Sequence, residues 1–205
     1  MKIILSNAGK RFNRDWIFRN TSYTFLSGHT YAITGTNGSG KSTLLQALAG
    51  SLEISEGKIE WRHNSDVIDA NNIYHFLTIA APYVEVIEEM TAVEFLHFHQ
   101  QFKPLIATIA VKEMLSLIGL EKAANKQIRY YSSGMKQRIK LAQAIFSNAP
   151  LLLLDEPCTN LDVSGFELYN KLIQEFATNK TIIVSSNDIN EYSFCDNVIS
   201  IMDYK

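Results

Sequence analysis

The sequence predicts an α/β fold with a mostly parallel sheet flanked by helices, and two stretches carry this prediction. In the first, the buried-strand pattern of residues 30–34 runs through a glycine-rich loop into a helix at residues 43–48. In the second, the apolar run 151–154 ends in Asp155 and Glu156. Strands that alternate with helices are typical of parallel sheets. The 205 residues suffice for a single domain spanning residues 1–205 with a small subdomain.

The first strands are expected at residues 2–5 and 21–26, with a turn at 13–15. Phe12 and Trp16 flank this turn. Either ring could stack on a nucleotide base, but a lone aromatic side chain more often packs in a core or covers a sheet edge.

The glycine-rich loop fits the pattern G-x-x-x-x-G-K-[ST] without a mismatch. Its glycines let the backbone wrap tightly and turn N–H groups inward, and the following helix presents its positive N-terminus to an anion. Lys41 can reach the β- and γ-phosphates of a nucleotide, and the Ser42 hydroxyl can bind Mg²⁺. The alternative is a glycine-rich turn that contains a lysine by chance. The loop residues expected to bind are Gly35, Thr36, Asn37, Gly38, Ser39, Gly40, Lys41, Ser42 and Thr43.

The next segment predicts a turn at 56–57, a strand at 58–61, a loop at 62–72 and a strand at 76–81 that ends at Pro82. A capping box at Thr91 and Glu94 then opens a helix that Pro104 breaks, and a second helix ends at Gly119. These helices predict a small helical subdomain, at approximately residues 83–148.

Ser132, Ser133 and Gly134 precede a further helix at 139–146. Serine is a good helix cap, and the glycine leaves backbone N–H groups bare, so this is a second possible anion site or only a cap.

Asp155 and Glu156 follow a buried strand at the sheet edge where open α/β sheets bind ligands. Because neighbouring strand residues point to opposite faces, we expect the two carboxylates to have separate tasks. One carboxylate can hold Mg²⁺, and the other can orient or deprotonate a nucleophile. A helix capped by Asp162, a strand at 181–185 and a closing strand at 197–202 complete the expected fold.

Composition argues against some functions. The net charge is −2, so no basic surface favours nucleic acid. Two cysteines make no disulfide framework, and neither a signal peptide nor a membrane span is recognisable. We expect a soluble cytoplasmic protein.

Over almost its whole length the sequence resembles the ATP-binding subunit of ABC transporters. The loop from Gly35 to Ser42 resembles the Walker A motif, and the strand ending at Asp155 resembles Walker B. The stretch Tyr131-Ser132-Ser133-Gly134-Met135 resembles the signature loop, and Asn160-Leu161-Asp162 the D-loop.

The resemblance implies a P-loop NTPase core with an antiparallel β subdomain, and ATP and Mg²⁺ as ligands. It implies that Phe12 stacks on adenine, Asp155 binds Mg²⁺ with Ser42, and Glu156 is the general base. Ser132 and Gly134 would contact the ATP of a second subunit, in a homodimer or a heterodimer with a paralogue. Integral membrane subunits would be the partners, on the cytoplasmic face of the membrane.

Two positions depart from the family pattern. The expected Q-loop glutamine falls on Pro82, and the switch histidine falls on Asn187. Asn187 can still donate a hydrogen bond to the γ-phosphate but cannot carry charge.

Three functions follow as hypotheses. The first is an ATPase that powers a transporter, and the signature variant and short length look most like export-type systems. The second is a nucleotide-gated switch with little turnover, motivated by Pro82 and Asn187. The third is a soluble relative acting on DNA or ribosomes, which the absence of coiled-coil insertions and of basic surface disfavours.

Overall fold

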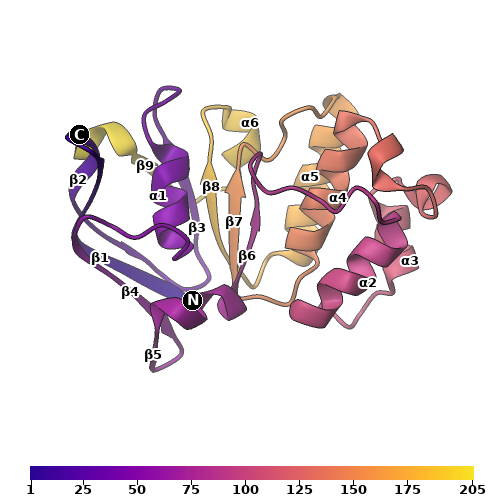
Figure 1. Cartoon of the computed structure of the whole chain (residues 1–205), viewed down its shortest axis with the longest axis horizontal. Coiled ribbons are helices and arrows are strands. Elements are labelled where there is room, and N and C mark those ends of the chain that lie inside the picture. The colour runs from indigo at the N-terminus through magenta and orange to yellow at the C-terminus, as the bar shows by residue number, and fades with distance from the viewer.

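The computed structural model describes all 205 residues and contains two sheets (Figure 1). The larger sheet has five parallel strands in the order β6-β7-β8-β3-β9. The smaller sheet is antiparallel, in the order β2-β1-β4-β5. The strands are β1 (Lys2–Phe12), β2 (Asp15–Phe25), β3 (Thr30–Thr34), β4 (Glu56–His63), β5 (Asp66–Ile68), β6 (Leu77–Ala80), β7 (Leu151–Asp155), β8 (Thr181–Ser185) and β9 (Asn197–Ser200).

Six α-helices join these strands, and short 3-10 helices occupy Ala70–Phe76, Glu121–Ala123, Ile128–Tyr130 and Ile201–Tyr204. None of the helices combines the length and apolarity that a membrane span requires. The helices are α1 (Lys41–Leu48), α2 (Ala92–Phe102), α3 (Val111–Leu117), α4 (Ser133–Ile145), α5 (Val163–Phe176) and α6 (Ile189–Tyr192).

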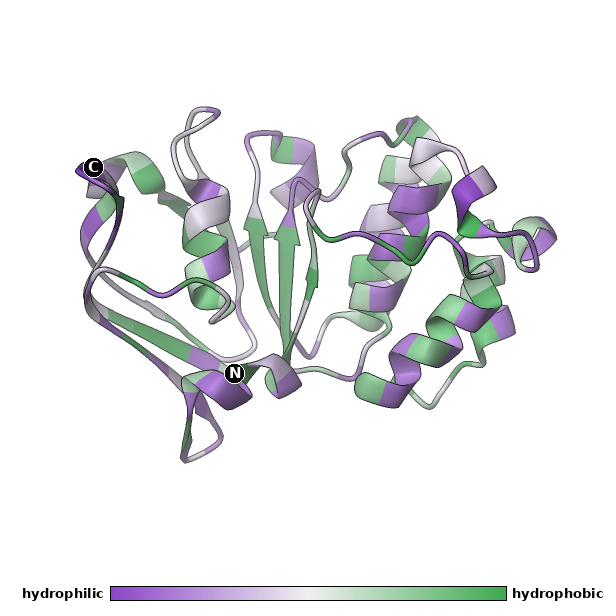
Figure 2. Cartoon of the chain, in the orientation of Figure 1, coloured by the Kyte–Doolittle hydropathy of each residue, from purple (hydrophilic) through white to green (hydrophobic).

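The parallel sheet separates two hydrophobic cores, which explains the run of four leucines in β7. Leu151 and Leu153 pack in one core with α1 and the antiparallel sheet. Leu152 and Leu154 pack in the other with α2, α3, α4 and α5. Alternate side chains point to opposite faces, so a strand covered on both sides must be apolar throughout. The central strands β7 and β8 are accordingly buried throughout and hydrophobic in their middle residues (Figure 2). The predicted α/β class is confirmed, and the antiparallel pairs between named strands all belong to the smaller sheet.

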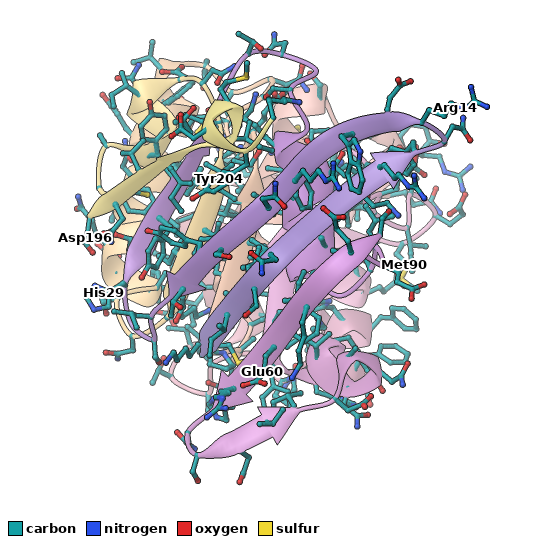
Figure 3. All side chains as sticks on the ribbon, turned by 90° about the vertical axis from the view of Figure 1, so that its left-hand side faces the viewer. Arg14, His29, Glu60, Met90, Asp196 and Tyr204 are labelled. Carbon is teal, nitrogen blue, oxygen red and sulfur yellow. The ribbon has the colours of Figure 1, made fainter.

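The antiparallel sheet is larger than the sequence suggested. Its two long strands β1 and β2 meet at a tight turn near Arg14, and β4 carries Glu60 beside them (Figure 3). The loop expected at 62–72 is wrong, because β4 and β5 form a hairpin there. Asn64 adopts φ 55°, a left-handed conformation that asparagine tolerates in hairpin turns.

Candidate functional site

The loop between β3 and α1 depends on its glycines. Gly35, Gly38 and Gly40 all have positive φ, at 147°, 75° and 98°. A Cβ on Gly40 would lie 2.2 Å from Ile17 Cγ2, and one on Gly35 would lie 2.7 Å from Ile201 Cγ2. These two positions therefore require glycine for space as well as for backbone conformation.

The N-terminus of α1 is left open. Its cap residue, Gly40, offers no side-chain acceptor, whereas Thr91, Ser132 and Asp162 cap α2, α4 and α5. Free N–H groups at a helix start form a site for an anion. The Lys41 side chain is buried and folds back over the loop, where its ammonium donates to Gly35 O at 2.8 Å.

A pocket of about 230 Å³ lies over this helix start. Ile17 borders it from β2, and Glu156 reaches it from the end of β7. The lining comprises Ile17, Asn37, Gly38, Ser39, Gly40, Lys41, Ser42, Thr43 and Glu156. The pocket thus joins the glycine-rich loop to one of the two acids that the sequence singled out.

Glu156 reaches the pocket because the strand stops one residue before it. Glu156 has φ 44°, a left-handed conformation that costs a non-glycine residue about 1–2 kcal/mol. Its N–H donates to Ser185 O at 2.9 Å. Strand alternation therefore does not set the direction of Glu156, which lies in a turn beyond β7, and the separate tasks expected for the two acids stay a prediction. Such strain at a polar site is a signal of function.

Asp155 is buried with an unsatisfied oxygen. Only 2% of the residue is exposed, and Asp155 Oδ1 has no hydrogen-bond partner. Ser185, its neighbour on β8, has an equally unpartnered hydroxyl. A buried carboxylate without a partner is costly, and a bound cation would satisfy it. Asp155 therefore has the chemistry of a Mg²⁺ ligand, and Ser42, which lines the pocket at the start of α1, offers a hydroxyl oxygen of the same kind.

Asn187 contacts the glycine-rich loop directly. Its Oδ1 accepts from the Gly35 N–H at 3.1 Å, and its Nδ2 donates to Asn37 Oδ1 at 3.1 Å. The structure thus brings Asn187 to the glycine-rich loop. Pro82 lines another pocket, together with Glu85, Lys136 and Lys140.

The two aromatic candidates differ in their surroundings. Phe12 ends β1 with a half-exposed ring, and the Lys10 ammonium lies 5.0 Å from its centroid. Trp16 is held by two guanidinium groups, from Arg11 at 5.5 Å and Arg19 at 4.4 Å. Phe12 thus has the more open ring face for a base, and Trp16 packs against its own sheet.

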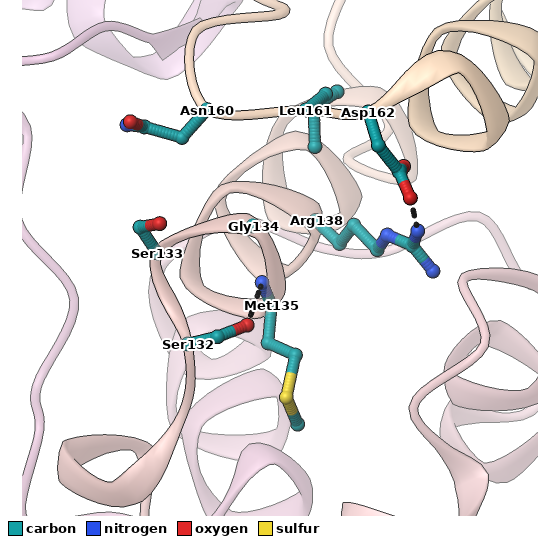
Figure 4. Close-up of a pocket in the computed structure, with 8 residues that line it drawn as sticks. All are labelled: Ser132, Ser133, Gly134, Met135, Arg138, Asn160, Leu161 and Asp162. Atoms are coloured by element: carbon teal, nitrogen blue, oxygen red, sulfur yellow. Dashed lines mark hydrogen bonds and ion pairs between the residues drawn. The ribbon is translucent and has the colours of Figure 1, made fainter.

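The Ser132–Gly134 segment lines a separate pocket of about 360 Å³, together with Asn160, Leu161 and Asp162 (Figure 4). Ser132 Oγ caps α4 by accepting from Met135 N at 3.3 Å, so its O–H remains free to donate. A Cβ on Gly134 would lie 3.1 Å from Asn160 O. This pocket and the one at the glycine-rich loop share no lining residue, so a single chain does not close Ser132 over the loop.

Sequence reasoning missed Tyr83, which follows Pro82 at the edge where β6 ends. Burial raises the pKa of Tyr83 to about 12, with the Asp155 charge acting in the same direction and the Gln46 side chain opposing it. Tyr83 is therefore a neighbour of the acidic site. Its place after a strand that pairs with β7 was the signal that could have found it.

Comparison with known proteins gives one family. A protein-family model described as ABC transporter matches residues 18–159 of the chain. The chain is 32% identical to the uncharacterized ABC transporter ATP-binding protein YybJ of Bacillus subtilis, over 93% of this chain and 88% of YybJ. It is 29% identical to the cytochrome c biogenesis ATP-binding export protein CcmA of Aliivibrio fischeri, over 84% of this chain and 89% of CcmA.

Solved structures share the fold. A putative ABC transporter ATP-binding protein from Pyrococcus furiosus superposes with a TM-score of 0.82 at 20% identity, covering 100% of both chains. The ATP-binding cassette MJ0796, solved as a dimer in a post-hydrolysis state bound to ADP and Pi, has a TM-score of 0.79 at 24% identity, covering 97% of this chain and 93% of MJ0796.

Proposed function

The chain belongs to the ABC transporter family, and on that premise we propose that it binds and hydrolyses ATP to drive transport through separate membrane subunits. The observation that carries this proposal is the pocket that joins the uncapped start of α1, Lys41 and Glu156. Family membership supports ATP-driven transport in general, and the pocket supports hydrolysis in particular. The likeness to CcmA, an export protein by name, favours export.

The residues of the chain divide the chemistry among them. The N–H groups of the glycine-rich loop and the Lys41 ammonium would hold the phosphates and stabilise charge on the transferred phosphoryl group. Glu156 would orient a water and accept its proton. Asn187 would hold the loop and donate to the terminal phosphate. Asp155 and Ser42 would hold Mg²⁺, which when bound neutralises charge on the phosphates.

Two subunits are needed to complete this site. Ser132 and Gly134 lie in a pocket apart from the loop, with the serine O–H free to donate. In a homodimer, or a heterodimer with a paralogue, they would close over the ATP held by the other subunit. Closing and opening of this pair would move membrane subunits docked beside Pro82 and Glu85, at the cytoplasmic face of the membrane.

A steady-state assay of phosphate release tests the proposal, with the Lys41→Ala variant as control. Hydrolysis predicts release by the wild type that requires Mg²⁺ and is lost in the variant. Release equal to that of Lys41→Ala, with the membrane subunits present, would contradict it.

The second candidate is a nucleotide-gated switch with little turnover. Asn187 favours it, because a neutral amide hydrogen-bonded to the loop cannot supply the charge of a histidine. This candidate predicts that ATP binds and closes the dimer while phosphate release stays at the level of Lys41→Ala.

A further inference from the structure

Glu191 is a buried carboxylate with no part in the function described so far. It belongs to the short helix α6, which follows Asn187, and only 5% of the residue is exposed. Its Oε1 accepts from the Cys158 N–H at 2.8 Å, while its Oε2 is buried without a partner. Ionisable side chains are almost never buried this completely unless something specific holds them.

The carboxylate joins two segments that are about thirty residues apart in the sequence. Cys158 lies in the turn that leaves Glu156, and the Thr159 N–H closes this turn by donating to Glu156 O at 3.2 Å. Glu191 comes from the segment that carries Asn187, where Asp188 caps α6 through the Asn190 N–H. The bond to Cys158 therefore ties the Glu156 turn to the Asn187 segment.

Other hydrogen bonds hold each of the two segments that the Glu191–Cys158 bond connects. The Tyr169 hydroxyl of α5 donates to Glu191 O at 2.9 Å, which holds α6 in place. On the other side of the turn, Gln137 Nε2 of α4 donates to Pro157 O at 2.6 Å. The turn is thus held on one side by the helix that follows Asn187 and on the other by the helix that Ser132 caps.

We propose that Glu191 is a positioning residue whose carboxylate oxygen holds the turn at residues 156–161 against the Asn187 segment, so that Glu156 and Asn187 respond to the terminal phosphate as one unit. The expected effect on hydrolysis rests on the function proposed above, whereas the coupling of the two segments through the Glu191–Cys158 hydrogen bond does not.

The length of the side chain matters more than its charge. Burial raises the pKa of Glu191, the nearby Ser186 hydroxyl and the Cys158 N–H oppose this rise, and the charges of Asp188 and Glu156 add to it. The surroundings therefore tolerate a neutral group. Glutamine keeps the acceptor oxygen at the same reach, whereas aspartate keeps the charge but is one methylene too short for Cys158.

The test compares the full chain with Glu191→Gln, Glu191→Asp and Glu191→Ala. Glu167→Ala, an exposed glutamate on the neighbouring helix α5, is the control. Hydrogen exchange of residues 157–161 and of the glycine-rich loop is followed with and without MgATP, alongside kcat and KM. Aspartate disturbs packing less than alanine does, so it keeps the test valid where alanine fails to fold.

We expect MgATP to protect both segments in the wild type, Glu191→Gln and Glu167→Ala. In Glu191→Asp the loop stays protected, the response of residues 157–161 is lost, and kcat falls about tenfold or more with little change in KM. A residue that only supports the fold would lower thermal stability and leave this response intact.

Two results would overturn the proposal: a wild-type response of residues 157–161 in Glu191→Asp, or loss of that response in Glu191→Gln. A wild type that binds MgATP without phosphate release would instead overturn only the proposed hydrolysis. The hydrogen-exchange measurement would still decide whether Glu191 couples the two segments.

Discussion

Replacing Gly40 by alanine is the sharpest perturbation of the glycine-rich loop. At φ 98° a Cβ strains the backbone by about 1–2 kcal/mol. The new methyl would also stand 2.2 Å from Ile17 Cγ2, and overpacking of this kind costs about 1–3 kcal/mol more. Because Ile17 borders the pocket, relief of this clash must move either the β2 edge or the start of α1.

Two other glycines allow the effect of backbone strain to be measured without a steric clash. Gly28, outside the site, has φ 77° and Gly38, within the loop, has φ 75°, and a Cβ on either meets nothing within 4 Å. Gly28→Ala should therefore lower Tm by about 2–8 °C through strain alone, at about 2–4 °C per kcal/mol for a chain of this size. It should leave MgATP affinity unchanged.

Thermal melts with and without MgATP, together with titration calorimetry, measure both effects. At about a hundred times Kd, MgATP adds about 2.7 kcal/mol to the stability of any variant that binds it. We expect this gain in the wild type and in Gly28→Ala, and its loss in Gly40→Ala. Adding Ile17→Ala removes the Cγ2 atom and should restore part of the gain. A full MgATP gain in Gly40→Ala would refute the reasoning.

Three further predictions concern single side chains. Asp155→Asn should raise the Tm of the nucleotide-free protein, because a carboxylate with one buried, unpartnered oxygen loses its charge, yet it should abolish the Mg²⁺ dependence of ATP affinity. A lower Tm in the absence of nucleotide would contradict this. Asn187→Ala removes both contacts to the loop and should lower phosphate release by about tenfold or more; an unchanged rate would show that the contacts do not matter. Burial lowers the pKa of Lys180 to about 8 from 10.5. Between pH 8 and pH 10.5 the unfolded chain therefore binds more protons than the folded one. The free energy of unfolding should rise with pH over this range, by up to about 3 kcal/mol. Lys180→Met should abolish this rise in urea unfolding measured across that range, and an identical rise in the variant would exclude Lys180 as its source.

The sequence predicted the parallel core because each of its signals is local. Four leucines in succession demand a strand covered on both faces, and Thr91 and Asp162 cap the helices predicted after them. Ser132 also caps a helix, but α4 begins at Ser133 and not at residue 139 as predicted. The strand at 58–61 was predicted, but its hairpin with β5 was not, because β5 is short and largely exposed and the turn depends on one left-handed asparagine.

The candidate site was less accessible to sequence reasoning where long-range contacts decide it. The loop motif predicts phosphate binding by itself, but the approach of Ile17 to Gly40 and of Asn187 to Gly35 depends on tertiary packing. The turn at Glu156 was missed because strand alternation was extended one residue too far. Glu191 gave no signal, since an isolated glutamate in a short helix usually faces solvent.

The central claim, that two subunits enclose ATP between the glycine-rich loop of one and the Ser132 segment of the other, is tested most directly by the mass of the Glu156→Gln variant. Glutamine keeps the size of Glu156 but cannot accept a proton, so ATP should persist and hold the pair closed. Size-exclusion chromatography with light scattering in ATP and Mg²⁺ should then give twice the chain mass of 23.2 kDa. The dimer should revert to a monomer when Lys41→Ala is added. A variant that binds ATP yet remains monomeric, both alone and when mixed with its membrane partner or a paralogue, would contradict the account.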